Sequence, residues 1–231
     1  MKVEIWSDVV CPFCYIGKRK FENALNSFAH KEAVEVVWKS FQLDPTTQPN
    51  PGQSVAASLA HKKGWSMEQV QQINAQVTQA AQEVGITYQL DKAVIANTGD
   101  AHRLIHLAKH HQLQDAAEER LFAAYFTEGK DIGDKATLVQ LGTEIGLNAE
   151  EVQQVLESDQ YAEAVEQDQY EAQQLGIRGV PFFVFNQKYG VSGAQPSDVF
   201  TEVLEKVWEE EKPLKTVVGD GTACSIDGTC S

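Results

Sequence analysis

The sequence predicts an α/β fold in which a β-α-β unit and a β-β-α unit are separated by a large all-helical insertion. Three observations predict it. The first 43 residues alternate as a strand, a helix and a second strand. Residues 51–175 then carry helical periodicity with several capping residues. Strand patterning returns only after Gly176 and is followed by one last helix.

The first unit opens with a strand at residues 2–6, where Val3 and Ile5 alternate with their neighbours. A helix follows from Pro12 to about Ala29, because proline suits the first helical turn and apolar residues then recur at helical spacing. Residues 34–43 alternate again and predict the second strand. Two strands joined through a helix predict a parallel pair with a right-handed crossover.

Prolines and a glycine at residues 45–52 mark a boundary near residue 50. In the insertion, Ser66 with Gln69 predicts the start of a helix that Gly85 ends, and Asn148 with Glu151 predicts another helix start. Further helices are expected near residues 100–108, 121–126, 137–146 and 161–175. The insertion therefore spans residues 51–175.

The second unit begins with a strand from Val180 to Phe185, and Asn186-Gln187 can turn the chain into an antiparallel partner strand. Pro196 then starts the last helix. This order is that of the thioredoxin fold. We expect a thioredoxin-like domain built from residues 1–50 and 176–212, an inserted helical domain at 51–175, and a C-terminal tail at 213–231.

Composition narrows the function classes. The net charge of −14 would repel a polyphosphate, which disfavours nucleic acid as a partner. No apolar run approaches the roughly 20 residues of a membrane helix. The N-terminus lacks the features of a secretory signal, so we expect a cytoplasmic protein. Because cytoplasmic thiols are kept reduced, a close cysteine pair there favours redox catalysis or metal binding.

Cys11 and Cys14 stand two residues apart where the first strand meets the first helix. At a helix amino terminus, unpaired N–H groups and the helix dipole stabilise the Cys11 thiolate that attacks a disulfide. Cys14, one helical turn further, can attack the resulting mixed disulfide and release the product. This spacing and context predict a redox dithiol.

Other interpretations of the cysteines and histidines stay open. Cys11 and Cys14 could share a zinc ion with the tail pair Cys224 and Cys230, or could be inert buried residues.

His102, His106 and His110 share one helical face and could hold a metal, but no further ligand is placed with similar regularity. We therefore predict no metal site, with His102 packed in the insertion facing the dithiol groove and the other histidines solvated. Lys18, Arg19 and Lys20 are expected to be solvated as well.

The motif VVCPFCYIGK at residues 9–18, with RGVPFFVFNQKYGVSGAQP at 178–196, resembles the DsbA-family thioredoxin-fold oxidoreductases, in particular their FrnE-like cytosolic branch. The resemblance implies a nucleophilic Cys11, a resolving Cys14, and a cis peptide bond between Val180 and Pro181. It covers nearly the whole chain. The substrate-binding residues that we predict around the dithiol are Pro12, Phe13, Val180, Pro181 and His102.

Two departures refine the predicted function. Secreted DsbA proteins carry histidine where this chain has Phe13, and phenylalanine cannot hydrogen-bond to sulfur, so we expect a protein disulfide reductase or isomerase rather than a strong oxidant. The related kappa-class glutathione transferases and hydroxychromene-carboxylate isomerases usually carry serine at the position of Cys11 and are the alternative. We expect no bound cofactor, and glutathione is a candidate co-substrate. The expected partners are thiols and disulfides of proteins or small molecules.

Cys224 and Cys230 flank an Asp-Gly turn signal near the end of the chain. A disulfide closing so short a loop would stabilise the fold by only about 2 kcal/mol. We therefore predict a second redox pair that exchanges with Cys11 and Cys14. The alternative is a solvated tail whose thiols have no role.

Overall fold

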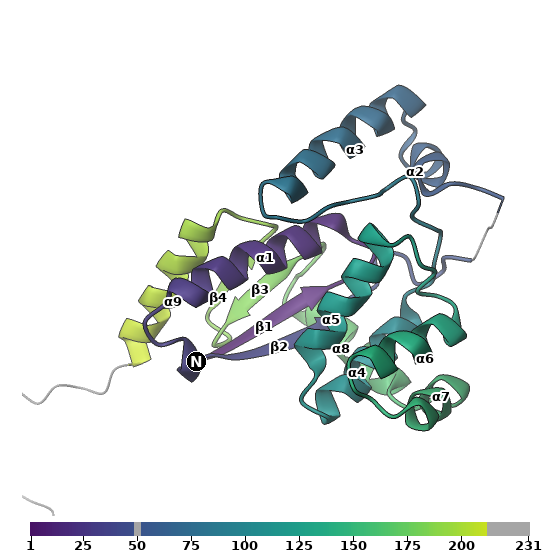
Figure 1. The fold of residues 1–231 in the computed structure, drawn as a ribbon. Coiled ribbons are helices and arrows are strands. Elements are labelled where there is room, and N and C mark those ends of the chain that lie inside the picture. Colours follow the sequence, from purple (N-terminus) through teal and green to yellow (C-terminus); the bar gives the residue numbers. More distant parts are fainter. Residues whose placement is uncertain (49–51, 212–231) are drawn as a thin grey trace, which may run out of the picture.

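The computed structural model describes residues 1–48 and 52–211, which form a four-stranded mixed sheet with helices on both faces (Figure 1). The strands are β1 (Lys2–Ser7), β2 (Glu35–Ser40), β3 (Phe182–Phe185) and β4 (Tyr189–Ser192), in the order β2-β1-β3-β4. β1 pairs parallel with β2 and antiparallel with β3, which pairs antiparallel with β4. The predicted thioredoxin arrangement is confirmed.

One face of the sheet is covered by α1 (Pro12–Ser27) and α9 (Ser197–Glu211), which lie side by side (Figure 1). The alternating residues Val3 and Ile5 of β1 point into this layer and are fully buried. Phe200 of α9 packs edge-on against Phe183 of β3, with ring centroids 4.6 Å apart. Burial of these apolar side chains fixes the direction in which α1 leaves the dithiol.

The helical block between the two units covers the other face and the carboxyl end of the sheet (Figure 1). Its helices are α2 (Val55–Lys63), α3 (Met67–Gln82), α4 (Gly99–His110), α5 (Gln114–Phe122), α6 (Lys135–Glu144), α7 (Ala149–Glu157) and α8 (Ala162–Gln174). A π-helical turn, η2 (Ala123–Thr127), extends α5, and a 3-10 turn, η1 (Lys31–Ala33), precedes β2. Trp6 of β1 donates its indole N–H to the Asp168 carbonyl of α8 at 2.9 Å, which ties this block to the sheet.

Several helix ends and one turn follow the sequence signals. The capping box of Ser66 with Gln69 is formed, and Asn148 accepts a hydrogen bond from the amide of Glu151. Asn186 and Gln187 both adopt left-handed backbone angles, with φ of 48° and 56°, as a two-residue hairpin turn between β3 and β4 requires. The predicted hairpin is therefore confirmed.

The hydrophobic core runs across the predicted boundary between the sheet unit and the insertion. Val9, Cys14 and Tyr15, from the loop after β1 and from α1, belong to the same buried cluster as Leu121 and Phe122 of α5. Tyr15 and Phe122 stack with ring centroids 4.9 Å apart. The dithiol thus lies where the end of the sheet meets the helical block.

Candidate active site

Cys11 occupies the N-cap position of α1, with Pro12 at the first helical position. Its amide donates to the Asp8 carbonyl at 2.9 Å, and its own carbonyl accepts from the amide of Cys14 at 3.0 Å. The Cys11 side chain therefore lies at the amino-terminal end of α1, the position that the sequence predicts for the nucleophile, and it makes no capping hydrogen bond to the helix. Both Cys11 and Cys14 are free thiols.

Cys14 lies directly behind Cys11 and is inaccessible to solvent. Burial raises its pKa well above the usual value, and the adjacent Cys11 raises it further. The backbone of Asp8 and the side chain of Ser7 act on this pKa in the opposite direction. Cys14 therefore holds its proton more firmly than an exposed thiol, and it must lose that proton before it can attack a disulfide.

The loop before β3 closes the site from the opposite side. The Val180-Pro181 peptide bond is cis, as the family resemblance implied. Cys11 Sγ lies 3.6 Å from the Val180 carbonyl oxygen. A Cβ atom at Gly17 would come within 2.9 Å of the Pro181 ring, so the bare backbone of α1 at Gly17 allows this close approach. Two of the residues predicted to bind substrate, Val180 and Pro181, are thereby brought against the dithiol.

The two residues between the cysteines, Pro12 and Phe13, make different contributions to the site. Phe13 is 46% exposed and offers an apolar surface next to the dithiol. The Pro12 carbonyl accepts a hydrogen bond of 2.6 Å from the Tyr88 hydroxyl. Tyr88 lies in the segment between α3 and α4, so the helical block fixes the backbone of the motif directly. Sequence reasoning did not single out Tyr88.

Of the histidines of α4, His102 and His110 are placed as predicted, packed and exposed respectively, whereas His106 is not. His102 is only 1% exposed, and its Nε2 lies 3.4 Å from Asp8 Oδ1. This burial agrees with the predicted packing of His102 within the insertion, and its role in substrate binding stays a prediction. His106 is also buried, not solvated, with Nε2 3.1 Å from both Ser40 Oγ and Asp168 Oδ2. Within residues 1–48 and 52–211, no three histidine, cysteine or acidic side chains are grouped as metal ligands would be.

Lys18 also contradicts the prediction, because it is 1% exposed. Its ammonium group lies against Glu22, against Asp115 at 3.3 Å and against Glu119 at 3.1 Å. Burial lowers the pKa of Lys18, but these three carboxylates raise it more, so it stays charged. The helical insertion covers a face of α1 that the sequence pattern alone placed in solvent.

A second acidic residue of α5 is fully enclosed. Glu118 is 1% exposed, and its Oε2 has no hydrogen-bond partner among the described residues. Burial raises the pKa of Glu118 to about 8; Lys18 lowers it, while Asp115 and Asp8 raise it. Glu118 lies on the apolar face of α5, together with Leu121. A carboxylate at such a position is the sequence signal that could have identified it.

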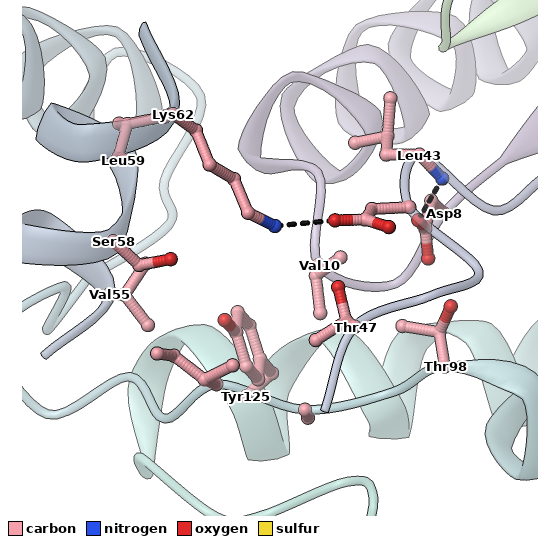
Figure 2. Close-up of a pocket in the computed structure, with 13 residues that line it drawn as sticks. Asp8, Val10, Leu43, Thr47, Val55, Ser58, Leu59, Lys62, Thr98 and Tyr125 are labelled. Carbon is pink, nitrogen blue, oxygen red and sulfur yellow. Dashed lines mark hydrogen bonds and ion pairs between the residues drawn. The ribbon is translucent and has the colours of Figure 1, made fainter. Parts of the chain in front are cut away.

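A cavity of about 210 Å³ lies beside the loop that leads from β1 to the dithiol (Figure 2). Asp8 and Val10 of this loop and Tyr125 of η2 form part of its wall. Lys62 of α2 pairs there with Asp44, at 2.5 Å. Apolar walls with a few charged groups suit a small polar ligand or part of a peptide.

The predicted second redox pair, Cys224 and Cys230, lies outside the described residues, so its role stays a prediction. Among the helices that the structure describes, none has the length and apolar character needed to cross a membrane.

Comparison with known proteins identifies the family. Residues 2–205 match the model of the DsbA-like thioredoxin domain. YwbO of Bacillus subtilis, an uncharacterized protein, is 28% identical over 204 residues, which cover 87% of this chain and 94% of YwbO.

Solved structures agree in fold. The probable DsbA oxidoreductase SCO1869 of Streptomyces coelicolor superposes with a TM-score of 0.88 at 43% identity, covering 100% of this chain and 98% of that one. The cytosolic disulfide reductase DsbM of Pseudomonas aeruginosa superposes with a TM-score of 0.66 at 17% identity, covering 91% and 100%. The sequence match over nearly the whole length, together with the dithiol at the start of α1, shows that this chain belongs to the DsbA-like thioredoxin family of oxidoreductases.

Proposed function

We propose that the protein is a thiol–disulfide oxidoreductase that reduces or isomerises disulfides through Cys11 and Cys14. One observation carries this proposal. Cys11 lies at the amino end of α1 with its sulfur 3.6 Å from the Val180 carbonyl, and the enclosed thiol of Cys14 lies behind it. A thiol at a helix start is stabilised as thiolate, and a neighbouring thiol can then resolve the mixed disulfide.

The chemistry proceeds in two exchanges. The Cys11 thiolate attacks one sulfur of a substrate disulfide, so a mixed disulfide forms and the other substrate sulfur leaves as a thiolate that takes a proton from water. Cys14 then loses its proton, and its sulfur attacks Cys11 Sγ. The Cys11–substrate bond breaks, and the second substrate sulfur leaves with the electron pair. The substrate is reduced by two electrons and the dithiol is oxidised to a disulfide.

Phe13 supports a reducing or isomerising direction. An oxidant of this type is strong because its reduced form is stabilised, and hydrogen bonds to the thiolate are one source of that stabilisation. The Phe13 side chain offers none. We propose that the protein works in the cytoplasm, where a reductase operates, and reduction is also the direction named for DsbM.

The substrates that fit this site carry thiols or disulfides. The exposed ring of Phe13 suits an apolar peptide segment, and the cavity lined by Asp8 and Lys62 suits a small charged ligand. We propose glutathione as a co-substrate that returns the oxidised dithiol to its reduced form. Cys224 and Cys230 are proposed to exchange with the dithiol as a second pair.

Reduction of insulin disulfides tests the proposal. Cys11→Ser is expected to abolish turnover, and Cys14→Ser is expected to lose turnover while accumulating a mixed disulfide on Cys11, detectable by mass spectrometry. The double variant Cys224→Ser, Cys230→Ser is the matched control: it keeps the dithiol and reports separately on the second pair. Full insulin reduction by Cys11→Ser would refute the proposal. Activity that survives loss of Cys14 and needs glutathione would instead indicate the glutathione-dependent isomerase or transferase.

A further inference from the structure

Helix α3 carries almost no charge, although the protein as a whole is rich in carboxylates. Residues 64–82, which contain α3 and the turn before it, include one charged residue, Glu68, and six glutamines. By contrast, α7, α8 and α9 carry three, four and six acidic residues, with one lysine between them. Glutamine favours a helix about as well as glutamate or lysine does, so helix formation does not explain this composition.

One side of α3 presents neutral side chains to the surroundings of the protein, and we call this set the α3 face. Its members recur at a spacing of three or four residues, which keeps them on one side of the helix: Trp65, Gln69, Gln72, Ile73, Gln76 and Ala80. Trp65 is 37% exposed, the three glutamines are exposed, and Ile73 and Ala80 are half-buried. Five of the six residues line a hollow of about 280 Å³. Figure 1 shows α3 at the outer edge of the molecule.

A face of this composition can be removed from water at a low cost in free energy. Burying an amide that finds a hydrogen-bond partner costs far less than burying a carboxylate or an ammonium group. Tryptophan is enriched among the residues that dominate the binding energy of protein interfaces, and charged residues are depleted from interface centres. The α3 face therefore suits contact with another protein surface.

Two properties of the chain favour a second copy of itself as the partner. The net charge of −14 makes two copies repel each other, so they approach most easily through a surface that carries no charge. Each glutamine amide has both hydrogen-bond donors and an acceptor, so a stripe of glutamines can hydrogen-bond to an identical stripe. The α3 face is thus complementary to itself in charge and in hydrogen bonding.

We propose that the α3 face is a self-association surface through which two copies of this chain pair about a twofold axis. In such a pair each contact occurs twice, and the two α3 helices run antiparallel across the axis. With the axis between Gln72 and Ile73, Trp65 of one copy lies opposite Ala80 of the other, so a large ring meets a small side chain. This inference goes beyond the dithiol chemistry and does not depend on it.

The same register places Gln69 of one copy opposite Gln76 of the other. The side-chain oxygen of Gln69 already accepts a hydrogen bond of 2.8 Å from the Ser66 amide within the capping box. The NH2 group of Gln69 is left to donate to the side-chain oxygen of Gln76 in the other copy. The two copies therefore form this amide pair without breaking the cap of α3.

The size of the face sets the strength of the association. A helix of 16 residues is about 24 Å long and about 10 Å wide, so one side of α3 offers less than the roughly 800 Å² per partner that a stable interface buries. We therefore expect a weak dimer whose population depends on protein concentration.

Sedimentation velocity of the full chain tests the inference, in a reducing buffer so that no disulfide links two copies. Between about 5 and 500 µM, we expect the sedimentation coefficient to rise from that of one chain toward that of two. A coefficient that stays at the value of a single chain over the whole range overturns the inference.

Charge substitutions locate the surface. In Gln72→Glu with Gln76→Glu, carboxylates face each other across the axis, and association is expected to be at least 10-fold weaker than in the parent. Gln72→Lys with Gln76→Lys should have the same effect. An equimolar mixture of the two double variants should associate at least as tightly as the parent, because opposite charges then face each other.

The control places the same charge on the other side of the helix. Gln71→Glu with Gln82→Glu should leave association within twofold of the parent, and all four substituted positions are exposed, so the fold is retained. A mixture that associates no better than either charged variant alone overturns the inference, as does an equal loss in the control.

Insulin reduction by the same variants separates a second copy from another occupant. If the parent stays a single chain and Gln72→Glu with Gln76→Glu slows insulin reduction, the α3 face binds a polypeptide substrate and self-association is refuted. Sedimentation reports the pairing of copies whether or not insulin is a substrate, so the proposed function and this inference fail independently.

Discussion

The sulfur of Cys11 faces the Val180 carbonyl, whereas the sulfur of Cys14 is enclosed by α1, the end of β1 and the helical block. Cys11 is 5% exposed and Cys14 is not exposed at all, which favours Cys11 as the thiol that attacks first. The same enclosure that protects Cys14 from direct reaction also raises its pKa and creates its need for a proton acceptor.

The burial of Glu118 predicts an unusual pH dependence of stability. Its pKa of about 8 in the folded state exceeds the value near 4.5 of an exposed glutamate. Between these two pH values only the folded state holds the proton, so the free energy of unfolding falls as pH rises through this window, by a few kcal/mol in total. Glu118→Gln is expected to remove this fall. Urea unfolding from pH 4.5 to 9 measures it.

Glu119 is the matched control, since its pKa shifts the other way. Burial raises the pKa of Glu119, but hydrogen bonds from Tyr15 and Arg19 lower it more. Glu119→Gln should therefore lose stability at pH 7 and keep the fall between pH 4.5 and 8. An identical pH dependence of stability in Glu118→Gln and the parent chain would contradict the raised pKa of Glu118.

At the residue scale, the sequence identified the dithiol and the Val180-Pro181 loop but not the groups around them. A local motif places Cys11 and Cys14, because their chemistry depends on the start of one helix. The burial of Lys18 and His106 depends on which distant segments pack against them. That information lies in contacts between segments roughly 100 residues apart in the chain, such as Lys18 with Asp115, and no local pattern contains it.

Among the elements, α1 holds the dithiol at its start, and the loop before β3 packs against it. Gly17 allows α1 and this loop to come into contact. Gly17→Ala would place a methyl group 2.9 Å from the Pro181 ring, so the loop or the helix must move. We expect a loss of about 1–3 kcal/mol in unfolding free energy and a changed reaction rate of Cys11. Gly179→Ala, in the same loop with open space around its Cβ, should be close to neutral.

Urea unfolding, and the rate at which Cys11 reacts with a chromogenic disulfide, compare the two glycine variants. Equal effects of Gly17→Ala and Gly179→Ala would show that the contact between Gly17 and Pro181 has no special weight.

The segment between α3 and α4 holds the motif through the hydrogen bond from Tyr88 to the Pro12 carbonyl. Tyr88→Phe removes the hydrogen bond from the tyrosine hydroxyl to this half-enclosed carbonyl and is expected to lower the unfolding free energy by about 1 kcal/mol. Tyr189→Phe, whose hydroxyl bonds the exposed Glu210, is the control and should have almost no effect. Chemical denaturation compares them, and a larger loss in the Tyr189 variant would contradict this account.

Element by element, the sequence was most informative where an apolar stripe or a cap is present. The hairpin at Asn186-Gln187 and the start of α3 at Ser66 were predicted because their signals are local. α2 was not singled out, since none of its side chains is buried and it has no apolar stripe. The start of α5 at Gln114 was missed because no side-chain cap marks it.

In the whole molecule, the helical block and the sheet unit share one core around the dithiol. Tyr15 of α1 stacks on Phe122 of α5, and Trp6 of β1 bonds to α8. We expect the parts to unfold together, in a single transition with equal calorimetric and van't Hoff enthalpies. Differential scanning calorimetry measures both. Two separated transitions would show that residues 51–175 form an independent unit.

Met1 and the last residue of α9 lie together, far from the dithiol. The ammonium group of Met1 lies 3.6 Å from the carboxylate of Glu211, next to the start of β1. Cys11 follows the other end of β1. The six residues of β1 separate its two ends by about 20 Å. A linker attached at Met1 would therefore anchor the protein to a bead or an electrode with the reactive sulfur turned outward. Electron transfer to the immobilised protein could then be measured without blocking the access of substrate to Cys11.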